Sequence, residues 1–159
     1  MNAATANEVP YYQMISWQIE EYLRNRWGTD RINILNLGDE AGLISTSSGK
    51  STLLLANLTQ VDISKLEAGA LAELDLGIER YELVAAVFSL SSHDNGCKKL
   101  MFQKVRQALA PKNSEFILGC RDESLASIEE QKEWLRTSEF KEVRTLSQKD
   151  QTALVIASL

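Results

Sequence analysis

The segment Gly42–Leu55, GLISTSSGKSTLLL, contains residue types that bind phosphate in many nucleotide-binding proteins. A loop of the P-loop type has a glycine five residues before the glycine of its Gly-Lys-Ser/Thr end, because successive backbone N–H groups must converge on the phosphates. Five residues before Gly49 lies Ile44, and Gly42 is two residues too early. We therefore expect Gly49 at the break of a helix and Lys50 in solvent, and nucleotide binding is our third hypothesis for this chain.

His93 is the only histidine, and it follows the apolar segment 81–90. Its neutral imidazole could accept a proton from a substrate hydroxyl or amine. A lone loop histidine without a chemical role is the alternative, and the pattern leaves both open. Cys97 and Cys120 form neither a Cys-x-x-Cys pair nor a metal-ligand spacing, so we expect two free thiols and no metal.

The composition is that of one globular domain, with 159 residues, 44% hydrophobic and 25% charged. Seventeen basic and 22 acidic residues give a net charge of −5, which argues against nucleic-acid and anionic-membrane partners. The sequence has neither a secretory signal pattern nor an apolar run of the roughly 18 residues that a membrane helix needs, so we expect a cytoplasmic protein. Residues 1–10 are small and polar and predict a flexible tail before a single domain over 11–159.

Apolar periodicity predicts an alternation of helices and strands. An amphipathic helix is expected from Tyr11 to a stop near Gly28, and further helices at 64–74, 101–109 and 127–138. Ser64 and Glu67 have the spacing of a capping box at the start of the second of these helices. Near-continuous apolar runs predict strands buried on both faces at 31–38, 81–90, 115–120 and 152–158. This order is typical of an α/β three-layer sandwich with a mostly parallel sheet.

Several stretches, in this order, resemble the class I S-adenosylmethionine (SAM)-dependent methyltransferases over roughly residues 12–158. They are INILNLGDEAG (32–42), VDIS (61–64), RYELVAAVFSLSSHD (80–94), LMFQKVRQALAPKNSEFILG (100–119) and EWLRTSEFKEVRTLSQKDQTALVIAS (133–158). The resemblance implies a Rossmann-like fold with an antiparallel last strand and a SAM site at the strand ends. The family's cofactor-contacting positions would fall on Gly38, Glu40, Gly42, Asp62 and Asp75, with His93 near the acceptor in an active enzyme.

The alternatives for the two aspartates stay open at this point. Asp62 is the ribose ligand by resemblance, but a polar cap before the following helix explains it equally well. Asp75 could match the family's adenine contact, and an aspartate at a helix end needs no such role.

The sequence departs from the family at the glycine-rich turn and in length. Glu40 replaces the middle glycine, and two like charges about 4 Å apart at an effective dielectric of 20 repel by roughly 4 kcal/mol, so an inward Glu40 would oppose the cofactor carboxylate. The family's strand acid would fall at Asn36. Only residues 39–80 separate the first strand from the next confident one, where two βα units of about 30 residues each are typical. Either the third strand or the first crossover helix must be missing.

These departures lead to the expectation of a methyltransferase-like domain that has lost efficient SAM binding and serves as a structural or protein-interaction module without a cofactor. The pseudo-methyltransferase domains of fatty acid and polyketide synthases, and that of anamorsin-type proteins, are similar in being shortened. The partners of the present domain would be another protein or the neighbouring domains of a larger assembly. An active methyltransferase that uses SAM on a small molecule is the alternative.

Overall fold

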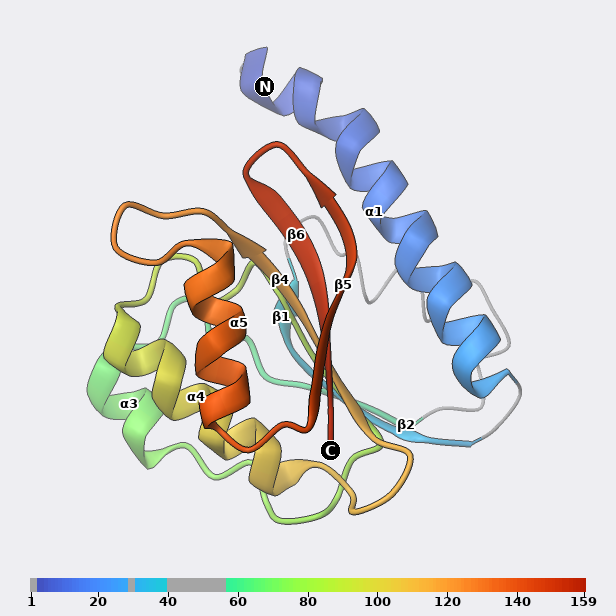
Figure 1. Cartoon of the computed structure of the whole chain (residues 1–159), viewed down its shortest axis with the longest axis vertical. Helices are drawn as coiled ribbons and strands as arrows, with labels where there is room; N and C mark the ends of the chain where they lie inside the picture. The colour runs from blue at the N-terminus through green and yellow to red at the C-terminus, as the bar shows by residue number, and fades with distance from the viewer. Residues whose placement is uncertain (1–2, 29–30, 40–56) are drawn as a thin grey trace.

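A single six-stranded sheet with helices on both faces forms the structure, a computed structural model that describes residues 3–28, 31–39 and 57–159 (Figure 1). Helices α3, α4 and α5 cover one face, and α1 lies across the other. The elements in chain order are α1 (Ala3–Trp27), β1 (Asn33–Asp39), β2 (Asn57–Gln60), α3 (Ala68–Glu73), β3 (Leu83–Val87), α4 (Asn95–Ala108), β4 (Glu115–Arg121), α5 (Ile128–Thr137), β5 (Glu142–Lys149) and β6 (Thr152–Ser158).

The strand order is β2-β1-β3-β4-β6-β5. Strands β2, β1, β3 and β4 are parallel, whereas β6 runs antiparallel to both of its neighbours. The predicted fold class, a Rossmann-like three-layer sandwich with an antiparallel last strand, is confirmed.

Alternating side chains of the central strands supply two hydrophobic cores, as expected for strands buried on both faces. Val84 and Ala86 of β3 belong to the core under α3, α4 and α5, while Leu83, Ala85 and Val87 belong to the core under α1. The α1 side of the second core consists of Ile15, Ile19, Leu23 and Trp27, each at most 6% exposed.

Helix α1 begins earlier than predicted, and one of its tryptophans faces solvent. It begins at Ala3, inside the segment 1–10 that was expected to form a tail. The division into a tail and a single domain over 11–159 stays a prediction. Trp17 is 62% exposed, because it lies on the side of α1 away from the sheet. Among the described residues, no helix is both long and apolar enough to span a bilayer.

Helix α3 is shorter than predicted, and the capping box is wrong. The helix begins at Ala68 with Glu67 as its N-cap, and no side chain caps it. The Ser64 side chain instead donates a hydrogen bond to Asp62. Between β2 and β3 the structure contains only α3, so the family's third strand is missing from this part of the chain. The segment where the first crossover helix would lie is outside the described residues.

Candidate functional site

The carboxyl ends of β1, β2 and β3 meet at one edge of the sheet. In open α/β sheets ligands bind outside these ends, where the strand order reverses. The chain crosses from β1 to β2 on one side and reaches β3 on the other side of β1, so the reversal lies between β1 and β3. We call this edge the strand-end crevice and define it by Gly38, Asp62 and Ser89.

Gly38 is the point at which these three residues meet. Its φ is +111°, a conformation that L-residues rarely adopt. A Cβ atom at Gly38 would lie 2.8 Å from Asp62 Oδ1 and 3.1 Å from the Ser89 Cβ. Only glycine therefore lets the end of β1 approach its two neighbours this closely.

Asn36 occupies the position where the family has its strand acid, and it is buried at 1% exposure. Its Oδ1 accepts the Gly38 N–H at 3.1 Å. In the family the N–H groups of the glycine turn face the cofactor. Here the first of them already has an acceptor within the chain.

Asp62 follows β2 and is exposed, with Oδ1 facing Gly38. The same oxygen accepts the Ser64 N–H at 3.0 Å and the Ser64 hydroxyl at 2.6 Å. These bonds, the hydroxyl first, lower the pKa of the Asp62 carboxyl. Asp62 thus closes a local turn with Ser64 and is not a helix cap, because α3 begins at Ala68. Its role as a ribose ligand stays a prediction.

His93 is held between two loops. Its Nε2 lies 2.7 Å from the carbonyl oxygen of Ile63. Because a carbonyl only accepts, Nε2 carries the proton, and Nδ1 is the basic atom of the neutral ring. The bond joins the loop after β3 to the residue beside Asp62, so the imidazole lies next to the β2 end of the crevice.

Asp75, a further predicted site residue, is not brought together with Gly38, Asp62 and His93. The Asp75 Oδ1 accepts the Gly77 N–H at 2.8 Å and closes the turn after α3, with no recorded contact to Gly38 or Asp62 in the described part of the chain. Glu40 and Gly42 lie outside the described residues, as do Gly49 and Lys50 of the phosphate-loop-like segment.

Ser89 is the crevice residue that the sequence did not indicate. It is 3% exposed, and its hydroxyl has no hydrogen-bond partner among the described residues. A serine after an apolar strand is ordinary, so no sequence signal could have singled it out. The preceding Phe88 has a φ of +66°, a strained conformation for a non-glycine residue of the kind found at functional sites.

The loops after β3 and β4 are tied together beside the crevice. The Lys98 ammonium is 2% exposed and donates to the His93 carbonyl oxygen at 2.7 Å and to Glu123 at 2.5 Å. Arg121 lies over the Phe88 ring, 4.2 Å from its centroid. A cavity of about 570 Å³ opens between the two loops, with His93 and Lys98 among its lining residues.

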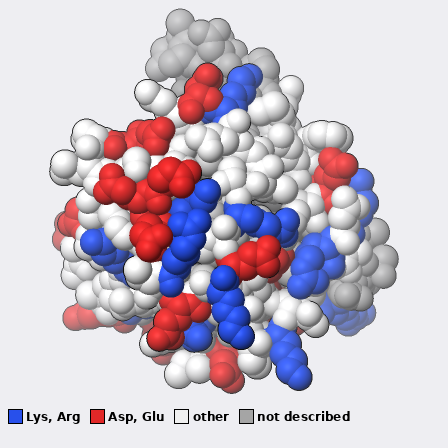
Figure 2. Space-filling model, in the orientation of Figure 1, with Lys and Arg blue, Asp and Glu red and all other residues white. Residues whose placement is uncertain are grey.

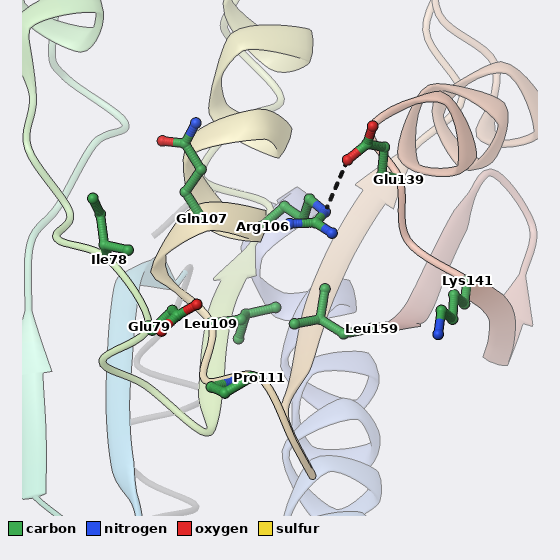
Figure 3. Close-up of a pocket in the computed structure, with 9 residues that line it drawn as sticks. All are labelled: Ile78, Glu79, Arg106, Gln107, Leu109, Pro111, Glu139, Lys141 and Leu159. Carbon is green, nitrogen blue, oxygen red and sulfur yellow. Dashed lines mark ion pairs between the residues drawn. The ribbon is translucent and has the colours of Figure 1, made fainter.

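Charges of both signs are interspersed over the face seen in Figure 2, with acidic side chains gathered over the start of α5. The first turn of α5 carries Glu129 and Glu130. A second cavity, of about 520 Å³, lies at the other end of the parallel strands, near their amino ends (Figure 3). It contains none of the predicted site residues.

No protein-family model and no curated protein matches the chain. Solved structures do. A SAM-dependent methyltransferase from Archaeoglobus fulgidus matches with a TM-score of 0.66 at 11% identity, over 98% of this chain and 99% of that one. The Burkholderia thailandensis 1,6-didemethyltoxoflavin-N1-methyltransferase, solved with S-adenosylhomocysteine, matches with a TM-score of 0.64 at 13% identity, over 97% and 81%.

A Nostoc punctiforme chain whose name proposes O-methyl transfer matches with a TM-score of 0.62 at 13% identity. The match covers 89% of this chain and 55% of that one, so this chain spans about half its length. At these identities the likeness concerns the fold. The chain has a shortened class I methyltransferase-like fold.

Proposed function

We propose that this chain is a methyltransferase-like domain that has lost efficient SAM binding and acts as a structural or protein-interaction module. One observation carries the proposal: Gly38 and Asp62, two of the family's cofactor positions, each already have a hydrogen bond to a neighbouring residue. The Gly38 N–H donates to Asn36, and one oxygen of Asp62 is held by Ser64. The imidazole Nε2 beside them is held by a backbone carbonyl.

The described residues fit bound SAM poorly for a second reason. In the family, the walls of the adenine site come partly from the third strand and its loop, and here only α3 and turns lie between β2 and β3. A ligand that loses one wall loses the apolar burial and the hydrogen bonds that this wall supplies. The partners of such a module would be another protein or neighbouring domains of an assembly.

An active small-molecule methyltransferase is the second candidate, and a specific observation favours it. Gly38 keeps its close approach to Asp62 and Ser89, and within the described part of the chain the buried Ser89 hydroxyl lacks a partner. The other Asp62 oxygen would be the remaining acceptor for a ribose hydroxyl. The similar structures are themselves SAM-dependent methyltransferases, and one was solved with S-adenosylhomocysteine.

Calorimetric titration with SAM and S-adenosylhomocysteine separates the two candidates. ATP with magnesium serves as the control for the phosphate-loop-like segment. We expect no micromolar binding by the wild type. Ser64 already donates hydrogen bonds to the Asp62 carboxylate, and Glu40 adds a negative charge at a position where the family has glycine. Glu40→Gly and Ser64→Ala, singly and together, test whether removing these two obstacles restores the site. Micromolar binding by the wild type would contradict the proposal.

A further inference from the structure

The cavity at the amino-terminal edge of the sheet is a groove with an apolar floor. Leu109, Pro111 and Leu159 form the floor, between the end of α4 and the end of β6 (Figure 3). Ile78 stands at its rim and is 73% exposed. Large apolar side chains exposed beside an apolar hollow are typical of interaction surfaces.

The groove carries one uncompensated charge of each sign. Figure 3 shows Glu79 and Lys141 on opposite sides of the floor. Both are exposed, and within the described residues neither has an ion-pair partner. Arg106 and Glu139, which also line the groove, pair with each other at 3.6 Å.

The backbone fixes the positions of both charged residues. The Glu79 N–H donates to the carbonyl oxygen of Gln107 at 2.8 Å, which ties its turn to the end of α4. The Lys141 N–H donates to Ser158 at 2.9 Å, which ties it to the end of β6. The two charges are therefore presented from rigid elements, which lowers the entropy cost of pairing with a partner.

We infer that this groove is the interface for a second copy of the same chain. A two-fold axis through the apolar floor would place Glu79 of each copy opposite Lys141 of the other. It would also bring the exposed Ile78 of each copy onto the Lys141 side of its partner's groove. An isologous interface needs such self-complementarity, in which one patch supplies both members of each contact. The inference is independent of whether the strand-end crevice binds SAM.

Sedimentation velocity over a wide concentration range tests this inference. We expect the wild type to form a dimer that weakens at high salt, because exposed charge pairs are screened. Lys141→Glu or Glu79→Lys alone places like charges in both pairs and should raise the dimer dissociation constant about tenfold or more. Lys149→Glu, at the far end of β5, changes the net charge equally and should leave the dimer unchanged.

Mixing the two single variants gives the decisive result. A heterodimer of Lys141→Glu with Glu79→Lys regains an opposite-charge pair at both positions, so the mixture should dimerise more tightly than either variant alone. Both positions are exposed, and circular dichroism would check that the variants are folded. A wild type that stays monomeric at all concentrations, or a mixture that associates no better than its components, would overturn the inference; in the first case a different protein becomes the occupant to seek.

Discussion

Replacing Gly38 with alanine tests whether three strand ends really converge at this residue. Alanine would have to adopt a φ of +111°, and its Cβ would lie 2.8 Å from Asp62 Oδ1 and 3.1 Å from the Ser89 Cβ. A strained backbone conformation of this kind costs about 1–3 kcal/mol, and displacement of packed neighbours costs a further 1–3 kcal/mol or so. We expect Gly38→Ala to lower the free energy of unfolding by about 2–6 kcal/mol.

Urea and thermal unfolding measure this cost, at roughly 2–4 °C per kcal/mol for a domain of this size. Gly69→Ala is the matched control, because Gly69 lies in α3 with no atom within 4 Å of its added Cβ. There alanine should stabilise the protein by about 0.5–1 kcal/mol. In an Asp62→Ala background the cost of Gly38→Ala should fall, because one crowding side chain is gone. Equal effects of the two glycine substitutions would refute the convergence.

Three further perturbations concern polar groups with specific partners. The Tyr22 hydroxyl donates to the buried Glu115, and burial raises the Tyr22 pKa above its ordinary value, so the folded protein keeps this proton while the unfolded chain loses it. Stability should fall as the pH rises above about 10, and Tyr22→Phe should flatten that fall in alkaline unfolding curves while costing about 1–2 kcal/mol at neutral pH. Ser64→Ala should raise the lowered pKa of Asp62, followed by carboxyl NMR titration; an unchanged pKa would contradict the assigned cause. Lys98→Met should cost about 1–3 kcal/mol in urea unfolding, because it leaves the His93 carbonyl oxygen and the half-buried Glu123 carboxylate without their donor, whereas an unchanged midpoint would show that the loops do not depend on it.

The four strands β1, β3, β4 and β6 were predictable because their burial on both faces produces continuous apolar runs, whereas the more exposed β2 and β5 produce none. The continuous apolar runs around Val84 and Ile117 are typical of central strands that are covered on both faces. The helix between them is typical of a connection between parallel strands. The small number of residues between β1 and β3 in the sequence also predicted correctly that an element of the family was missing.

The side-chain arrangement at the strand ends could not be predicted. The spacing of Ser64 and Glu67 fits a capping box, but the Ser64 hydroxyl finds the nearer Asp62 carboxylate, and helix α3 begins later. The partner of His93 is a backbone carbonyl thirty residues away, and backbone acceptors leave no trace in the residue pattern. Lone hydroxyls such as that of Ser89 are likewise visible only once packing is known.

Thermal unfolding of the wild type with and without S-adenosylhomocysteine tests the central claim most directly. A ligand present at 100 times its dissociation constant stabilises the folded state by about 2.7 kcal/mol, which corresponds to roughly 5–11 °C in a domain of this size. We predict that millimolar S-adenosylhomocysteine leaves the midpoint unchanged, because the Gly38 N–H and the Asp62 Oδ1 already bond within the chain. A rise of several degrees would contradict the loss of cofactor binding and identify the strand-end crevice as a working SAM site.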